Sequence, residues 1–289
     1  MTTAISVVPD GPAHTMRFDR RVVWITGAGS GLGAACAEEL ARRGAWLVLS
    51  GRRVDPLEAV AAQVRALGQR ALVLPLDVTD DDAQKASVKA IVAHCGRLDV
   101  AVANAGYAVS GKILGVTHEQ WRRQLDVNVL GLLSTARHAL PELQKTGGRI
   151  ALVGSVAGWL PLAGSGPYNT SKLAVRHIGE TLSIELQGSG VSCTSIHPGF
   201  VESDIARVDN DGVMKKDRTD PRPAKLMWTG PAAARVMVDA IALRKRQFVF
   251  TGHGRFGVMM ARRLPNLTYA LLAWAGRRGM SHRSPSGDR

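Results

Sequence analysis

The sequence predicts a single-domain α/β protein, built as a Rossmann-like doubly wound parallel sheet of about seven strands. Short apolar runs alternate with stretches of helical apolar spacing through most of the 289 residues, and such alternation is typical of a parallel sheet with helices on both faces. The runs are continuously apolar, as strands covered on both faces require. With 45% hydrophobic and 21% charged residues, the chain can form a large core without disulfides.

The strands and helices follow in order along the chain. Strands are expected at Val22–Thr26, Trp46–Ser50, Ala71–Leu76, Leu98–Ala103, Arg149–Val153, Val191–His197 and Gln247–Thr251. Helices are expected at Ala34–Arg43, Pro56–Leu67, Asp80–His94, Glu119–Gln144, Tyr168–Leu186 and Pro231–Leu243, from the 3.6-residue spacing of their apolar positions. Thr117 with Gln120 three residues later indicates a helix start, and Gly44 and Gly68 indicate helix ends. We divide the chain into an extension (1–20), the sheet domain (21–254) and a basic tail (255–289).

The sequence argues against disulfide bonds, metal sites and secretion. The three cysteines have no paired spacing, so neither a disulfide framework nor a zinc site is expected. The eight histidines show no metal spacing, and no metal is predicted. The first 20 residues lack the apolar core of a secretory signal, which predicts a cytoplasmic protein.

A glycine-rich turn follows the first strand and opens the first helix. Its members with a predicted cofactor contact are Gly27, Gly29, Ser30, Gly31, Leu32 and Gly33. Glycines let the backbone approach a pyrophosphate, and the helix N-terminus supplies N–H donors. A glycine cluster can also be only a tight turn, but its place in a βαβ unit favours a dinucleotide site.

The end of the second strand favours NADP over NAD. A dinucleotide fold usually has an acid here for the ribose hydroxyls, whereas this chain has Arg52 and Arg53. A guanidinium can bind a 2′-phosphate through two hydrogen bonds. We expect Arg52 to be that contact; the alternative is that both arginines are only solvated.

Three side chains suggest proton-transfer chemistry. Tyr168 and Lys172 share a face of one predicted helix, and Ser155 follows the fifth strand. A free phenol has a pKa of about 10, so a nearby ammonium and the positive ring of an oxidised cofactor would be needed to favour the phenolate. Ser155 could donate a hydrogen bond to a developing oxyanion. Tyrosine–lysine pairs are common on helices, so only the combination with the glycine-rich turn is specific.

In combination these motifs resemble the short-chain dehydrogenase/reductase family, over about residues 21–251. The resemblance implies catalytic roles for Ser155, Tyr168, Lys172 and Asn128, with Asn128 ordering a water that relays protons and Lys172 also holding the nicotinamide ribose. It implies further cofactor contacts at Asp77, Val78, Asn104, Ala105, Gly106, Pro198, Gly199, Val201 and Ser203. The chain departs from the family pattern in having Ala103 in place of an asparagine and Ser203 in place of a threonine.

The implied function is an NADP(H)-dependent oxidoreductase that interconverts an alcohol and a ketone or aldehyde. Trp159 and Phe200 are predicted to line the substrate side, and the polar stretch 200–228 is a candidate lid. These residues suggest a lipophilic small-molecule substrate, although Trp159 could instead pack against the lid or another subunit. A homodimer or homotetramer is expected. The alternative function is a cofactor-binding regulatory or scaffold protein of the same fold.

Most of the net charge of +13 lies in the C-terminal stretch that begins at Arg244. From Arg244 onward there are ten Arg and Lys against the single acid Asp288, and these basic residues bracket an apolar stretch at Leu264–Ala275. Nucleic-acid binding is therefore not expected. Twelve residues cannot span a bilayer, which takes about 20. Residues 255–278 could lie at a membrane interface or pack on the domain or a dimer mate, and the sequence leaves both open.

Overall fold

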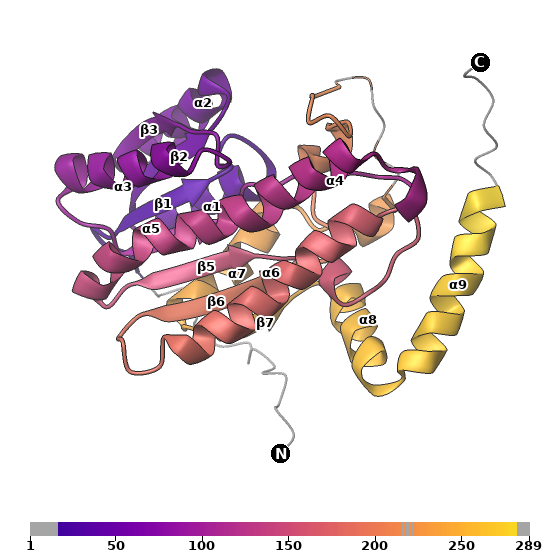
Figure 1. The fold of residues 1–289 in the computed structure, drawn as a ribbon. Coiled ribbons are helices and arrows are strands. Elements are labelled where there is room, and N and C mark those ends of the chain that lie inside the picture. Colours follow the sequence, from indigo (N-terminus) through magenta and orange to yellow (C-terminus); the bar gives the residue numbers. More distant parts are fainter. Residues whose placement is uncertain (1–16, 216, 218–219, 221, 282–289) are drawn as a thin grey trace.

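The computed structural model describes residues 17–215, 217, 220 and 222–281, without the side chains of 278–281. Seven strands form one parallel sheet in the order β3-β2-β1-β4-β5-β6-β7, which confirms the predicted fold class (Figure 1). The strands are β1 (Val22–Thr26), β2 (Trp46–Gly51), β3 (Ala71–Pro75), β4 (Val100–Ala103), β5 (Arg149–Val153), β6 (Ser192–His197) and β7 (Gln247–Val249).

Helices cover both faces of the sheet. Residues of α1 (Gly31–Arg42), α2 (Val54–Ala66) and α7 (Gly230–Ala242) share one buried cluster. Residues of α3 (Asp81–Cys95), α5 (Gly131–Thr146) and α6 (Gly166–Glu185) share the cluster on the other face.

Strand β1 shows why the strand sequences are continuously apolar. Val23 and Ile25 belong to the first cluster, whereas Val22 and Trp24 belong to the second. Successive side chains of a strand point to opposite faces, so every position of β1 is buried.

The predicted helix Glu119–Gln144 is divided in the structure. It consists of α4 (His118–Leu125), a π-helical turn η3 (Asp126–Leu130) and α5. The Thr117–Gln120 capping box at the start of α4 is confirmed. Apolar spacing alone does not reveal the π-helical turn, because it adds only one residue to the helical repeat.

The stretch 200–228, which we call the lid, contains local structure. Val201 pairs with Trp228 at its base, and Val208 pairs with Met214 in an antiparallel bridge. Two short 3₁₀ turns, η5 (Asp204–Arg207) and η6 (Ala224–Leu226), complete its described part.

The tail differs from its prediction in two respects. An additional helix, α8 (Gly252–Arg263), runs across the expected boundary between residues 254 and 255. The expected apolar helix follows it as α9 and extends further, over Pro265–Ser281. Together α8 and α9 form an arm at one side of the body (Figure 1).

Candidate active site

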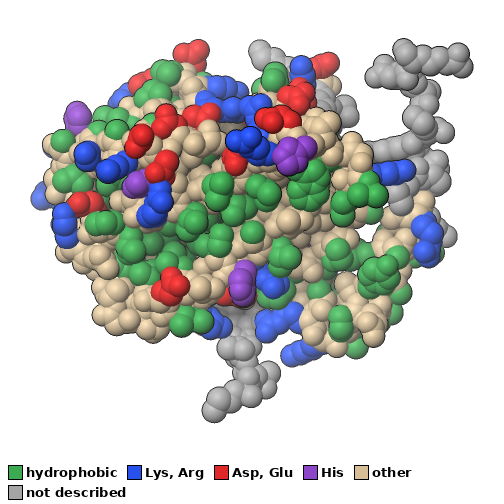
Figure 2. All heavy atoms as spheres, viewed as in Figure 1, with side chains coloured by type: hydrophobic (Ala, Val, Ile, Leu, Met, Phe, Trp, Pro, Cys, Tyr) green, Lys and Arg blue, Asp and Glu red, His purple; other side chains and the backbone are tan. Residues whose placement is uncertain are grey.

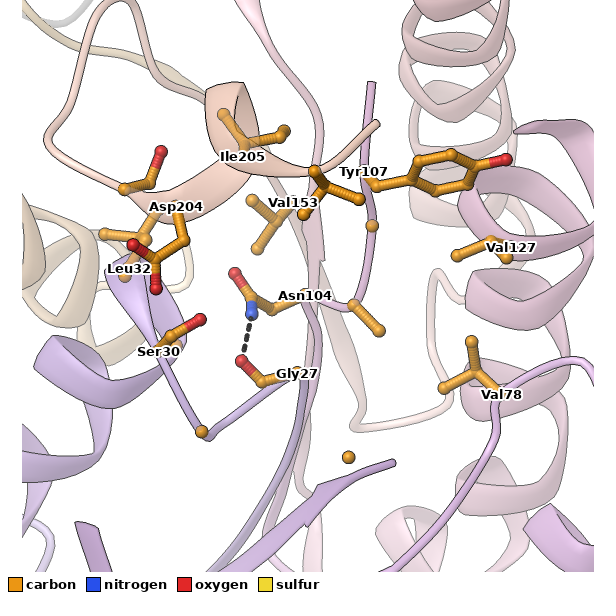
Figure 3. A pocket seen from close by; sticks show the side chains of 18 of the residues that line it. Gly27, Ser30, Leu32, Val78, Asn104, Tyr107, Val127, Val153, Asp204 and Ile205 are labelled. Carbon is orange, nitrogen blue, oxygen red and sulfur yellow. Dashed lines mark hydrogen bonds between the residues drawn. The ribbon is translucent and has the colours of Figure 1, made fainter. Parts of the chain in front are cut away.

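A pocket of about 320 Å³ lies at the carboxyl ends of the strands, where the strand order reverses between β1 and β4. Ligands of doubly wound sheets bind at this position. Among the residues that line it are all the predicted cofactor contacts: Gly27, Gly29, Ser30, Gly31, Leu32, Gly33, Arg52, Asp77, Val78, Asn104, Ala105, Gly106, Tyr168, Lys172, Pro198, Gly199, Val201 and Ser203. Figure 3 shows several of them around one cavity.

The glycine-rich turn is held closely against the end of β4. The Asn104 side chain donates from Nδ2 to the carbonyl oxygens of Thr26 (3.0 Å) and Gly27 (3.2 Å), the second of which Figure 3 draws. A Cβ on Gly33 would lie 2.2 Å from the Gly27 oxygen, so no side chain fits there. The sequence pattern is therefore a steric requirement of this turn.

The start of α1 suits an anionic group. Its N-cap residue Ser30 makes no side-chain capping bond, and the first turn carries no acid. The first N–H groups of a helix need partners, and the helix dipole favours negative charge near them. A cofactor pyrophosphate fits this position, because the glycines leave room for it and the N–H groups could bind it.

Lys172 is buried beside the predicted general acid/base. Its side chain is 4% exposed, and Nζ donates to the Val153 carbonyl oxygen at 2.9 Å. Nζ also lies 5.8 Å from the centroid of the Tyr168 ring. Burial lowers the pKa of Lys172 to about 8, so the ammonium form still dominates at neutral pH.

Tyr168 occupies the first turn of α6 and faces the pocket. Burial raises its pKa, and this effect outweighs a hydrogen bond with Ser155 and the positive charge of Arg222, which both lower it. The Ser155 hydroxyl oxygen also accepts from the backbone N–H of Ala157 at 3.1 Å. These surroundings keep Tyr168 as a neutral phenol at neutral pH, the form that can donate a proton.

Asn128 lies in the π-helical turn, fully buried and outside the pocket lining. Its Oδ1 accepts from the Tyr107 N–H at 3.1 Å, and its Nδ2 donates to the Tyr107 oxygen (3.0 Å) and to Ser171 Oγ (3.1 Å). Asn128 therefore ties the segment after β4 to α6. A Cβ on Gly106 would lie 3.0 Å from Asn128 Oδ1 and 3.7 Å from Lys172 Nζ. The side chains of Asn128 and Lys172 therefore both lie close to the backbone of Gly106.

The two predicted substrate-lining residues are not brought to this pocket. The Trp159 ring has the Arg176 guanidinium 4.0 Å and the Arg262 guanidinium 5.5 Å from its centroid. The Phe200 ring stacks on His253 at 5.1 Å. Contact of Trp159 and Phe200 with a substrate stays a prediction.

His197 is a core residue at the end of β6. Its side chain is fully buried, and its ring is nearly perpendicular to the Trp159 ring, with the centroids 6.2 Å apart. Burial lowers its pKa to about 3, so it is neutral at physiological pH.

Several lining residues were not singled out in the sequence. They include Tyr107, Arg123, Met214 and Arg222. Arg222 donates to the Val201 oxygen at 3.0 Å and to the Ser203 oxygen at 3.1 Å, and so holds the base of the lid. The only sequence signal for these residues is their place in or near segments that follow strands.

The lid is fastened across the pocket to the segment after β4. Asn210 Oδ1 accepts from the Ser110 N–H at 2.9 Å, and Asn210 Nδ2 donates to the Ser110 oxygen at 2.8 Å. Gln120 on α4 adds a bond to Asp211 at 3.3 Å. The lid residues Asp204, Ile205, Val208 and Met214 line the pocket.

Within the described part of the chain, no group of His, Cys, Asp or Glu side chains is placed to hold a metal ion. The same residues include no helix of sufficient length and apolarity to cross a bilayer.

Comparison with known proteins agrees with this geometry. Residues 21–213 match the family described as short chain dehydrogenase. The chain is 37% identical over 191 residues to an uncharacterized oxidoreductase of Myxococcus xanthus, covering 66% of this chain and 76% of that one. It is 33% identical over 229 residues to one of Staphylococcus epidermidis, covering 79% and 98%.

Two solved structures illustrate the structural similarity. A short chain dehydrogenase/reductase of Burkholderia phymatum in complex with NAD superimposes with a TM-score of 0.76 at 26% identity, covering 94% of this chain and 99% of that one. An alcohol dehydrogenase of Thermococcus sibiricus complexed with 5-hydroxy-NADP superimposes with a TM-score of 0.69 at 26% identity, covering 80% and 96%.

Proposed function

Because this chain belongs to the short-chain dehydrogenase family of oxidoreductases, we propose that it interconverts an alcohol and a ketone or aldehyde with NADP(H), using Tyr168 as the general acid/base. The observation that carries the proposal is the convergence of Tyr168, Lys172 and Ser155 on the pocket that the glycine-rich turn opens. A nicotinamide cofactor supplies or accepts the hydride in such a reaction.

Tyr168, Ser155 and Lys172 each have a separate role in the proposed reaction. Tyr168 donates its phenolic proton to the carbonyl oxygen in reduction and takes a proton from the alcohol in oxidation. Ser155 donates a hydrogen bond to the same oxygen, where negative charge develops. Lys172, fixed by its bond to Val153, presents a positive charge that stabilises the phenolate once the proton has left.

The preference for NADP rests on the charges at one end of the pocket. Arg52 and Arg53 follow β2, and Arg123 on α4 joins them in the lining. A guanidinium suits a 2′-phosphate, which the corresponding ribose of NAD lacks.

A lipophilic substrate is supported by four apolar side chains of the pocket lining, three of which belong to the lid. Val153, Ile205, Val208 and Met214 line the pocket. Apolar side chains are typical of the parts of a pocket that hold an apolar small molecule. The substrate is therefore proposed to be an apolar alcohol or its carbonyl counterpart.

Self-association is proposed through the face formed by α5 and α6. Leu133 and Leu173 are 41% and 47% exposed, and Leu130 and Ile184 are 57% and 68% exposed. Figure 2 shows hydrophobic side chains gathered over this face. Apolar patches of this kind mark contact surfaces. Light scattering after size exclusion should give a dimer or tetramer, and Leu173→Glu should lower the mass.

The decisive test is Tyr168→Phe, with Tyr269→Phe on the exposed surface of α9 as the matched control. Purified variants are screened against NADPH with ketones and aldehydes of graded size, and cofactor binding is measured by fluorescence. Tyr168→Phe should lower kcat at least about 1,000-fold with cofactor Kd nearly unchanged, and the control should stay active. Full turnover by Tyr168→Phe would refute the mechanism. Cofactor binding by the wild type without turnover of any substrate would favour a regulatory or scaffold protein.

A further inference from the structure

The arm formed by α8 and α9 carries an apolar stripe that the body does not cover. Leu267, Leu271 and Trp274 are 49%, 52% and 49% exposed. Their spacing of four and three residues places them on one face of α9. Thr268 is buried, and a Cβ on Gly276 would meet Ala163 at 3.2 Å, so the opposite side of α9 faces the body. The stripe is thus the outer face of the helix.

Exposed arginines lie on both helices of the arm. Arg262 and Arg263 end α8, Arg255 lies on its first turns, and Arg277 lies near the end of α9. All four are exposed, and residues 252–281 include no Asp or Glu. Figure 2 shows hydrophobic and basic side chains without acidic ones over this lobe. Leu264, at the bend between the two helices, and Phe256 add exposed fractions of 48% and 60%.

This combination distinguishes between two possible occupants of the surface. A second copy of the same arm would bring arginines against arginines, and like charges placed across an interface oppose association. An anionic lipid surface can accommodate both the apolar stripe and the arginines. The apolar side chains enter the acyl boundary, while the arginines remain among the anionic headgroups. Trp274 is a residue type that favours the interfacial depth.

We propose that the α8–α9 arm binds the surface of membranes that contain anionic lipids, with Leu267, Leu271 and Trp274 inserted and the arginines at headgroup level. The arm does not cross the bilayer. It is attached to the catalytic body, since α8 packs on the segment that follows Ser155: Cβ atoms on Gly254 and Gly257 would meet Val156 at 3.0 Å and Leu160 at 3.1 Å. A lipophilic substrate dissolved in the bilayer would therefore be close to the body.

Vesicle cosedimentation of the full-length protein tests the proposal. Vesicles of phosphatidylcholine alone are compared with vesicles that contain 30% phosphatidylglycerol. Near an anionic surface each arginine contributes about fivefold to binding, so Arg262→Gln with Arg263→Gln should weaken binding about 25-fold. The double variant Leu267→Glu and Leu271→Glu should abolish binding. The control Leu67→Glu, at the end of α2 and 40% exposed, should bind as the wild type does.

The outcomes separate the membrane from other partners. Binding to anionic vesicles that falls with added salt and with both arm variants supports the proposal. No pelleting of the wild type, equal pelleting of the Leu267→Glu and Leu271→Glu variant, or equal binding to both vesicle types would overturn it. A loss of oligomer mass in the Leu267→Glu and Leu271→Glu variant, without vesicle binding by the wild type, would assign the stripe to a second copy. Thermal melting of each variant checks that the fold is intact.

Discussion

The Arg52 guanidinium donates from Nη2 to the carbonyl oxygen of Gly212 at 3.3 Å, across 160 positions of the sequence. Arg52 follows β2, at the proposed 2′-phosphate end of the pocket, and Gly212 lies at the tip of the lid hairpin. The tip turns through a positive φ of 78° at Gly212 and is fixed from within by Asp209, whose carboxylate accepts from the N–H groups of Asp211 and Val213. One side chain therefore joins the cofactor end of the pocket to the lid.

Arg52→Ala should change the cofactor preference. The loss of charged hydrogen bonds to the 2′-phosphate should raise KM for NADPH about 10- to 100-fold. KM for NADH, which has no 2′-phosphate, should change less than about threefold. Steady-state kinetics with both cofactors measure this shift. Arg53→Ala is the matched comparison: if it produces the larger change, the 2′-phosphate contact belongs to Arg53. Equal KM values for NADPH in the wild type and in both variants would remove the basis for an NADP preference.

Asn210→Ala should loosen the lid without touching the proposed catalytic groups. The substitution removes both bonds to the Ser110 backbone, each worth about 1 kcal/mol. KM for the carbonyl substrate should rise about 3- to 30-fold, and trypsin should cleave faster in the lid, where Arg207 and Lys215 lie. Asn266→Ala on the exposed side of α9 serves as control. Unchanged proteolysis of Asn210→Ala would mean that the Ser110 contact does not hold the lid in solution.

Gly33→Ala should disrupt the cofactor turn. The added methyl group would lie 2.2 Å from the Gly27 oxygen and 2.6 Å from Asn104 Nδ2, and relief of this overlap requires a backbone shift that costs about 2–4 kcal/mol. Urea unfolding should show that loss, and cofactor binding should weaken in parallel. Gly252→Ala at the start of α8 meets nothing within 4 Å and should leave stability unchanged or slightly higher. A stable Gly33→Ala variant that binds cofactor normally would contradict the packing.

The buried lysine should make stability depend on alkaline pH. The pKa of Lys172 is about 8 in the folded protein against 10.5 for the free side chain. Between these values the unfolded chain binds the proton and the folded protein does not, so the free energy of unfolding rises with pH in that window. Relative to Lys172→Met, the wild type should gain up to about 3 kcal/mol from pH 7.5 to pH 10.5. Urea titrations at a series of pH values measure the difference, and parallel curves for the two proteins would exclude the shift.

The sheet and the cofactor turn could be predicted because their signals are local. Continuous apolar runs mark strands covered on both faces, and the Gly33 position tolerates no side chain, so the sequence itself carries the constraint. Contacts that depend on distant segments could not be predicted in this way. The contacts of Trp159 with Arg176 and Arg262 depend on how α6 and α8 pack, and no spacing along the chain encodes them. The same holds for the Arg52–Gly212 bond, whose partners meet only because the lid folds back over the pocket.

The π-helical turn at Asp126–Leu130 also determines which insertions and deletions the protein can accept. An α-helix advances about 100° per residue, so deleting one residue here would restore a regular helix and rotate α4 by about that angle relative to α5. Asn128 would then face away from Tyr107, and the capped start of α4 would move away from the lid residue Asp211. Deletion of a single residue here would therefore separate the scaffold from its site. The spacing between Thr117 and Gly131 is therefore as much a part of the site as the side chains themselves.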